Sequence, residues 1–285
     1  MKNGDLLLRV CELQVVPTLD RAKLKGPIVS HRVEHGLVTS VAGLAFLRAS
    51  SGNWSGGKLS RLGAGEIPAL CSREPVIELS DGSLGISAYF GSPATPDRAV
   101  FVRSFDGGNT WGDLSVIAQD DAHPRSDLIG LNFNETAIAD LGQGRMIAMI
   151  RCDESFTTTD GIFMPVGGVG SFHTAYSFNS GLSWSRPKST EIFGQPAHLL
   201  PLSDGRVLCT YGYRKKPYGI RAIISYDRGM TWDMKNEIIL RDDGLSWDLG
   251  YPMTLQLSDG AFFTVYYMSD KNGIRYIEGT RWVIS

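Results

Sequence analysis

A repeated stretch of eight residues constrains the fold of this chain most strongly. It reads Ser-Phe-Asp-Gly-Gly-Asn-Thr-Trp at 104–111 and Ser-Tyr-Asp-Arg-Gly-Met-Thr-Trp at 225–232, and a looser copy stands at 177–184. In each copy the Asp or Asn can cap nearby backbone amides, a Gly can adopt a left-handed backbone, and the Trp can fold back as an apolar plug. The repeat therefore predicts three equivalent tight turns, each at the end of a strand.

A second repeated turn separates pairs of strand-like segments. Leu-Ser-Asp-Gly occurs at 79–82, 202–205 and 257–260, and a looser copy, Leu-Gly-Gln-Gly, occurs at 141–144. Segments rich in Val, Ile, Leu, Tyr and Phe flank every copy, as β-hairpins require. The predicted hairpins pair 75–79 with 83–89, 136–141 with 145–150, 198–202 with 206–211, and 253–257 with 261–267.

The spacing of these turns predicts the architecture. Their last glycines follow one another at intervals of 62 (82 to 144), 61 (144 to 205) and 55 residues (205 to 260). A unit of this size with about four strands is typical of a β-propeller blade, and roughly 50 residues per blade gives five or six blades. We predict an all-β, six-bladed propeller of four-stranded antiparallel blades in a single domain, 1–285. Residues 71–285 carry the repeated turns, and the less regular residues 1–70 are expected to add one or two blades and to close the ring.

The composition limits the classes of binding partner and the cellular compartment that we expect for this protein. A net charge of −2 gives no support for binding to nucleic acid or to an anionic membrane surface. There is no run of about 18 apolar residues, so no membrane span is expected. The start of the chain lacks the apolar segment of a signal peptide, which favours the cytoplasm unless an export signal was removed. The four cysteines and five histidines are scattered without metal-ligand spacing, so no metal site is expected. No cofactor is predicted either. The oligomeric state stays open.

The predicted meander brings polar residues to one face of the propeller. In an antiparallel blade, the start of the first strand, the end of the second and the start of the third lie on the same side. A cluster of titratable groups at one mouth suits a site for an anionic small molecule. The alternative is a rim of ion pairs between loops, which are common and weak. The candidates at this face are Arg73, Asp97, Glu135, Arg151, Tyr211, Arg214, Arg221, Asp248 and Tyr251.

The order and spacing of these residues resemble those of exo-α-sialidases, over about residues 70–270. Arg73-Glu74-Pro75 is similar to the Arg-x-Pro that opens the family's pattern, and Asn134-Glu135 is similar to the Asn-Glu that begins a later hairpin. The octapeptides resemble the Asp boxes, or BNR repeats, of the same family. The resemblance implies a sialidase-like propeller that hydrolyses a terminal sialic acid or a related nonulosonic acid, with a sialylated or other acidic glycan as its substrate.

The resemblance also implies three catalytic roles. Tyr251 would be the nucleophile and Glu135 the base that takes its proton, since a phenol with a pKa near 10 needs a base. Asp97, which lies 24 residues after Arg73, would protonate the leaving oxygen and later activate water, with net retention. A neutral phenol avoids the repulsion that an anionic nucleophile would meet beside the carboxylate of a sialic acid.

Three arginines would bind that carboxylate in such a site. Planar guanidinium groups make charge-assisted hydrogen bonds to a carboxylate that Lys does not reproduce. The resemblance assigns Arg73, Arg151 and Arg221 to this role, with Arg214 competing for the third position. Two further residues at the mouth, Asp248 and Tyr211, are candidates for substrate binding.

Two departures from the family pattern keep other functions open. Glu74 stands where the family usually has an apolar residue, and Pro252 follows Tyr251 where the family tends to have a small Ser. One alternative is a propeller glycosidase or lyase that acts on a uronic-acid-containing polysaccharide, because one fold hosts several chemistries. Another is a non-catalytic glycan-binding propeller, which would need the arginines but not the Tyr–Glu pair.

Overall fold

The computed structural model describes the chain except for residues 1–5, 18–27, 33–36, 51–52, 62–69, 93–94, 122–129, 158–162, 167–169 and 285. The described part consists of β-strands, turns and one short 3₁₀ helix, η3 (Met234–Asn236), so the predicted all-β class is confirmed. In this part of the chain no helix is long and apolar enough to cross a membrane.

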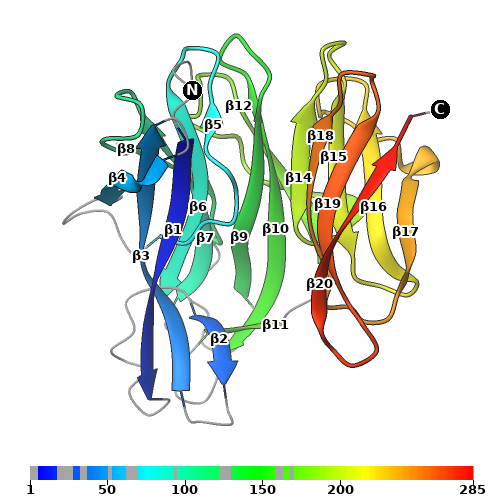
Figure 1. Cartoon of the computed structure of the whole chain (residues 1–285), viewed down its shortest axis with the longest axis horizontal. Helices are drawn as coiled ribbons and strands as arrows, with labels where there is room; N and C mark the ends of the chain where they lie inside the picture. The colour runs from blue at the N-terminus through cyan, green and yellow to red at the C-terminus, as the bar shows by residue number, and fades with distance from the viewer. Residues whose placement is uncertain are drawn as a thin grey trace.

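Four consecutive antiparallel sheets form propeller blades (Figure 1). The first blade contains β5 (Ile77–Glu78), β6 (Leu84–Ser92), β7 (Thr95–Ser104) and β8 (Gly112–Ala118). The second contains β9 (Gly130–Asp140), β10 (Met146–Thr157), β12 (Ser171–Ser177) and β13 (Lys188–Phe193), and β11 (Phe163–Val166) also pairs with β10. The third contains β14 (Ala197–Pro201), β15 (Val207–Tyr213), β16 (Tyr218–Ser225) and β17 (Ile238–Gly244). The fourth contains β18 (Gly250–Gln256), β19 (Phe262–Ser269) and β20 (Arg275–Trp282).

The predicted hairpins are confirmed in all four blades. The first two strands of each blade pair in an antiparallel register across the repeated turn. The third strand then pairs with the second, so the meander that the sequence predicts is present. This order places the starts of the first strands and the ends of the second strands on one side of the molecule.

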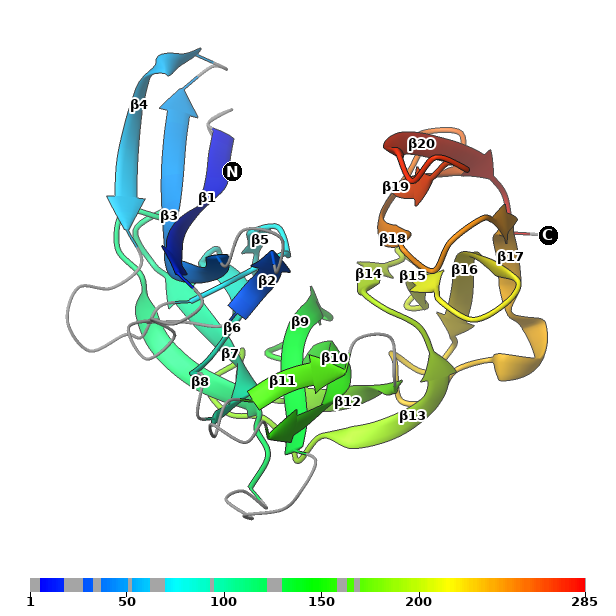
Figure 2. The ribbon, with the colours of Figure 1, turned by 90° about the horizontal axis from the view of Figure 1, so that it is seen from below.

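The predicted number of blades was wrong. The N-terminal strands β1 (Leu6–Pro17), β2 (Ile28–Arg32), β3 (Leu37–Ser50) and β4 (Asn53–Arg61) form a separate sheet in which β3 pairs with all three others, which is not the blade meander. The described residues therefore contain four blades and not six, because the length-based count treated these residues as regular blades. Figure 2 shows the sheets following one another along an arc. Among the described strands none of β1–β4 pairs with β18–β20, so the structure does not show the expected closure of the ring.

The core lies between neighbouring blades. Alternate residues of a strand point to opposite faces, and β10 uses both of its faces. Met146 and Ala148 pack with Phe101 of the first blade. Ile147 and Met149 belong instead to the cluster that the second blade shares with the third. The second blade is thus buried on both faces, which explains its continuous apolar sequence and fixes its position relative to the two neighbouring blades.

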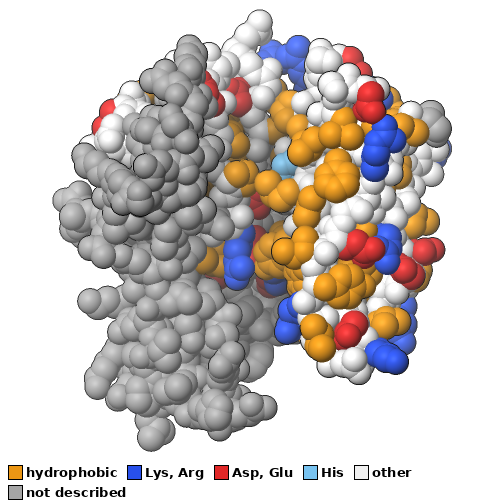
Figure 3. Space-filling model, viewed as in Figure 1, with side chains coloured by type: hydrophobic (Ala, Val, Ile, Leu, Met, Phe, Trp, Pro, Cys, Tyr) orange, Lys and Arg blue, Asp and Glu red, His pale blue; other side chains and the backbone are white. Residues whose placement is uncertain are grey.

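The fourth blade is covered on one face only. Its residues Phe262 and Tyr266 are buried, whereas Met253, Leu255 and Ile277 are exposed on the other face. Figure 3 shows hydrophobic side chains gathered over this part of the molecule. The alternation of buried and exposed residues along β19 therefore reflects packing against the third blade alone.

The three octapeptides adopt the same turn, as the sequence predicts. The side-chain oxygen at the third position accepts the N–H of the seventh residue, at 2.8, 3.0 and 2.8 Å for Asp106, Asn179 and Asp227. The Ser at the first position accepts the N–H of the fifth residue, at 2.7, 2.9 and 2.7 Å. These bonds satisfy backbone donors within the turn, so each copy ends its strand in the same way.

Gly181 in the second of these turns should be a sensitive stability position. Its φ is +83°, and a Cβ at this residue would overlap the ring of Phe101 in the first blade. Gly181→Ala should therefore lower the free energy of unfolding by about 3 kcal/mol, as left-handed strain and overpacking add. Gly205→Ala is the matched control, because φ there is +90° and no atom lies within 4 Å of the added Cβ. Gly205→Ala should lower the free energy of unfolding by only about 1–2 kcal/mol, the cost of the left-handed backbone. Denaturant unfolding measures both variants, and equal losses of stability would contradict the packing argument.

Candidate active site

A tyrosine and a glutamate from different blades meet at the centre of the candidate site. Glu135 lies on β9 and is 4% exposed, and Tyr251 lies on β18. The Tyr251 hydroxyl donates a hydrogen bond to Glu135 Oε1 at 2.6 Å. Glu135 also forms ion pairs with Arg73 Nε at 3.1 Å and with Arg151 Nη1 at 2.7 Å. The structure therefore brings together four of the residues that the sequence analysis selected, although they are far apart in the chain.

The backbone at Tyr251 is held in an uncommon conformation. Its φ is +51°, and Gly250 before it has a φ of +124°. The register between β18 and β19 shifts between Gly250 and Met253. A Cβ on Gly212 of the third blade would lie 2.9 Å from the Gly250 Cα, so two glycines permit this close approach. A left-handed backbone at a non-glycine residue is costly and is maintained only when its surroundings impose it. In this protein the left-handed conformation occurs at the residue whose hydroxyl donates a hydrogen bond to Glu135.

The electrostatics keep the phenol neutral and the carboxylate charged. Burial raises the pKa of Tyr251 well above its usual value, and the charge of Glu135 raises it further. Burial alone would also raise the pKa of Glu135, but Arg151 and Arg73 outweigh it and lower that pKa. At neutral pH the pair is therefore a neutral O–H that donates to an ionised acceptor, which is the arrangement that general-base activation of a phenol needs.

Asp97 is an acid that can hold a proton near neutral pH. Its backbone N–H donates to Asn132 Oδ1 at 2.8 Å. Burial raises the pKa of its carboxyl group to about 7, the charges of Asp153 and Glu135 add to the shift, and Arg151 opposes it. A carboxyl group with this pKa can both donate and accept a proton at neutral pH.

The carboxyl group of Asp97 packs directly on Gly91. A Cβ added at Gly91 would overlap Asp97 Oδ1 and lie 3.1 Å from the Asp97 Cα. If Asp97 is a catalytic acid, Gly91→Ala should displace its carboxyl group and lower kcat/KM by about 10²-fold, the effect of misplacing a reacting group, while the protein stays folded. Gly112→Ala, where no atom lies within 4 Å of the added Cβ, is the control and should keep its activity on the same substrate. Equal activities of the two variants would contradict a role for Asp97.

Two arginines lie close to the ring of Tyr251. The guanidinium carbon of Arg73 lies 5.4 Å from the ring centroid, and that of Arg214 lies 6.0 Å from it. Arg214 is also 5.8 Å from the ring of Trp247, and its Nε donates to the Leu249 carbonyl at 3.1 Å. Of the two candidates for the third arginine, Arg214 is therefore the one that lies beside Tyr251.

Arg221 contacts residues outside this cluster. It is 6% exposed, its guanidinium is 4.6 Å from the ring of Tyr213, and Nη1 is 3.6 Å from Glu237 Oε2. Its partner in the β15–β16 register is Tyr211, so both side chains point to the same face of the third blade. Tyr211 is fully buried, donates to Glu237 and packs edge-on against Phe172 of the second blade. Both residues thus contribute to the interface between the blades.

Asp248 holds the segment that precedes Tyr251. Its carboxylate accepts hydrogen bonds from the Tyr267 hydroxyl at 2.6 Å and from Arg275 Nε at 2.8 Å. Its backbone carbonyl accepts the Ser269 hydroxyl at 2.8 Å. These contacts tie the start of the fourth blade to β19 and β20, three residues before Tyr251.

Sequence reasoning missed a layer of buried polar residues beneath Arg151. Asp153 Oδ2 accepts Arg151 Nε at 2.8 Å, and Asp153 Oδ1 accepts Gln195 Nε2 at 2.6 Å. Trp247, which stacks near Arg214, was also missed. The available signal for Asp153 was its position two residues after Arg151, which places both side chains on the same face of a strand.

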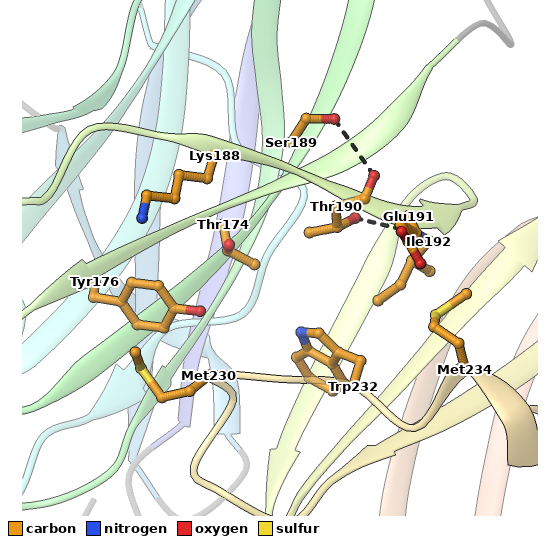
Figure 4. Close-up of a pocket in the computed structure, with 10 residues that line it drawn as sticks. All are labelled: Thr174, Tyr176, Lys188, Ser189, Thr190, Glu191, Ile192, Met230, Trp232 and Met234. Atoms are coloured by element: carbon orange, nitrogen blue, oxygen red, sulfur yellow. Dashed lines mark hydrogen bonds between the residues drawn. The ribbon is translucent and has the colours of Figure 1, made fainter.

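Other features of the described residues do not extend this site. No group of three His, Cys, Asp or Glu side chains in the described part could hold a metal ion. Cys71, Cys152 and Cys209 are buried and form no disulfide bond. A pocket of about 310 Å³ lies between β12, β13 and the third octapeptide turn, where Tyr176, Met230 and Trp232 line it (Figure 4). It shares no residue with the cluster around Glu135.

Comparisons with known proteins define the fold class. No protein-family model matches the sequence, and a search of curated proteins gives no match. Among solved structures, a protein of unknown function from Dyadobacter fermentans is 25% identical with a TM-score of 0.75, over 100% of this chain and 74% of its own. A NanB sialidase variant from Streptococcus pneumoniae is 16% identical with a TM-score of 0.54, over 86% of this chain and 37% of its own.

A sialidase from Trypanosoma rangeli, solved with the inhibitor DANA, is 11% identical with a TM-score of 0.55, over 98% of this chain and 43% of its own. The chain thus spans less than half the length of these two sialidases. At such identities the likeness shows the fold alone, which is a sialidase-like β-propeller.

Proposed function

We propose that this protein is a retaining exo-glycosidase that releases a terminal sialic acid, or a related nonulosonic acid, from a glycan. The observation that carries the proposal is the hydrogen bond of 2.6 Å from the Tyr251 hydroxyl to Glu135 Oε1, with the guanidinium groups of Arg73 and Arg214 near the tyrosine ring. Sialidases are the glycosidases that use a tyrosine nucleophile, and the propeller fold is the one that they share.

The first half of the reaction forms a bond between Tyr251 and the sugar. The phenol oxygen attacks the anomeric carbon while Glu135 takes the phenol proton. Asp97 gives its proton to the glycosidic oxygen, and the bond from this oxygen to the anomeric carbon breaks as the alcohol leaves. In the second half, Asp97 takes a proton from water, the resulting hydroxide attacks the anomeric carbon, and Tyr251 leaves with the proton that Glu135 returns. Two displacements at one carbon give retention.

The carboxylate of the sugar is bound by Arg73, Arg151 and Arg214. Each guanidinium has five N–H donors, so Arg73 and Arg151 can bind Glu135 and a ligand together. The Arg73 side chain is 43% exposed, which leaves it accessible to a ligand. The carboxylate would then lie near Tyr251, where a neutral nucleophile is needed.

The direct test is an assay of the wild-type protein on fluorogenic sialosides and on donors that carry other nonulosonic acids. We expect release of the fluorophore, and NMR of the first product should show the retained anomer. Inactivity on every such donor would refute the proposal. A new unsaturated sugar formed from uronate oligosaccharides would favour the uronic-acid alternative instead.

The pKa of Asp97 predicts a pH dependence. Asp97 must be protonated to act as an acid, and its pKa of about 7 means that this form is lost as the pH rises through 7. We therefore expect kcat/KM on a sialyl-oligosaccharide to fall above pH 7 by about tenfold for each pH unit. An aryl sialoside needs less protonation of its leaving group and should show a weaker decline. Identical profiles for the two substrates would contradict the role of Asp97 as the acid.

A further inference from the structure

A buried carboxylate beneath the site has no role in the proposed reaction. Asp153 lies on β10 and is 1% exposed. Its two oxygens accept hydrogen bonds from Arg151 Nε at 2.8 Å, Asn134 Nδ2 at 3.1 Å and Gln195 Nε2 at 2.6 Å. Residues from the second blade and from the segment that precedes the third blade thus converge on one acid. A buried charge is stable only with partners of this kind.

Asp153 connects two functional parts of the site. On one side it binds Arg151 Nε, and Arg151 uses Nη1 for its ion pair with Glu135 at 2.7 Å. On the other side, the β9–β10 register places Asp153 opposite Asn132, whose Oδ1 accepts the backbone N–H of Asp97 at 2.8 Å. Asp153 thus contacts Arg151 directly, and its partner in the strand register, Asn132, contacts Asp97.

We propose that Asp153 is a positioning residue that holds the Arg151 guanidinium toward Glu135 and whose negative charge opposes the ionisation of Asp97. The inference rests on the proposed function only where it names Asp97 as the acid. The geometry requires no contact between Asp153 and the substrate, so its effect passes through Arg151 and Asp97.

The charged and titratable groups that face Asp97 lie on three strands. Asp153 and Arg151 lie on β10, Glu135 lies on β9, and the buried Tyr89 lies on β6. Burial is the largest cause of the raised pKa of Asp97, and the Asp153 charge comes next, ahead of the opposing charge of Arg151. Like charges in a shared site disfavour ionisation of a buried acid, so the Asp153 charge favours the protonated form of Asp97.

The test is to neutralise Asp153 at nearly constant size. In Asp153→Asn, ¹³C NMR of the carboxyl groups should show that the titration midpoint of Asp97 has fallen from near 7 by about one pH unit or more. The Asp97 signal is assigned from its loss in Asp97→Asn. The basic limb of kcat/KM should move by the same amount. An unchanged midpoint in the folded variant would overturn the inference.

Two further variants keep the test decisive. Gln195→Leu removes one hydrogen bond to Asp153 but leaves its charge, so the Asp97 midpoint should stay near its wild-type value, and a shift as large as that of Asp153→Asn would overturn the electrostatic account. Asp153→Ser repeats the loss of charge with a smaller side chain if Asp153→Asn does not fold. Because the NMR midpoint needs no substrate, a lowered midpoint in a protein that is inactive on sialosides would support this inference while refuting the proposed function.

Discussion

Tyr251→Phe should lower kcat/KM on a sialoside by on the order of 10³-fold or more, because it removes the oxygen that we propose attacks the anomeric carbon. The ring keeps its contacts with Arg73 and Arg214, so the affinity for an unsaturated sialic acid analogue should change little. Steady-state kinetics and calorimetric binding measure the two quantities. Tyr213→Phe, a change beside Arg221 and outside the cluster, is the control and should retain its rate.

Glu135→Gln tests the other half of the pair. The amide keeps the size of the side chain but cannot take a proton, so the rate should fall by on the order of 10²- to 10⁴-fold. Because the two residues act as a unit, the double variant should be little worse than Tyr251→Phe alone. The proposed nucleophile and base would be contradicted if the rate losses of the two single variants multiplied in the double variant. They would also be contradicted if the rate of Tyr251→Phe stayed within tenfold of the wild-type rate.

Arg214→Ala should weaken the binding of a sialic acid analogue by roughly 10- to 100-fold, as expected for the loss of a charge-assisted hydrogen bond of about 1.5–3 kcal/mol. Arg221→Ala is the matched comparison. It should leave the affinity within about twofold and lower the stability instead, because Arg221 is buried and pairs with Glu237 at the blade interface. If Arg221→Ala weakened the binding and Arg214→Ala did not, Arg221 would be the third arginine and the assignment to Arg214 would be contradicted.

The sequence predicted the local elements well because their causes are local. An Asp that accepts backbone amides and a Gly with a positive φ determine each octapeptide turn, as at Asp227 and Gly229. The Leu-Ser-Asp-Gly turns likewise set the hairpins. Residues 6–61 contain no clear copy of either repeat. Their strands β1–β4 form a sheet in which β3 pairs with each of the other three strands. The number of blades depends on such non-local pairing, so length alone gave the wrong count.

The candidate site could be predicted only in part, because side-chain direction depends on the exact start of a strand. The Arg221 assignment assumed that the third strand of its blade begins at this residue. The strand β16 begins instead at Tyr218, so Arg221 lies inside it and faces the second blade with Tyr211. Arg214 lies in the loop that follows β15, where side chains do not alternate between two faces as they do along a strand. Its guanidinium group can therefore lie near the ring of Tyr251. Asp153 belongs to no sequence motif, and its contacts with Arg151 and Gln195 depend on the folded arrangement of the blades.

The most direct measurement is a crystal structure of the protein with the unsaturated sialic acid analogue. The account predicts that the guanidinium groups of Arg73, Arg151 and Arg214 converge on the carboxylate of the ligand, with its anomeric carbon next to the Tyr251 hydroxyl. A carboxylate bound at Arg221, or a ligand held away from Tyr251 and Glu135, would contradict it.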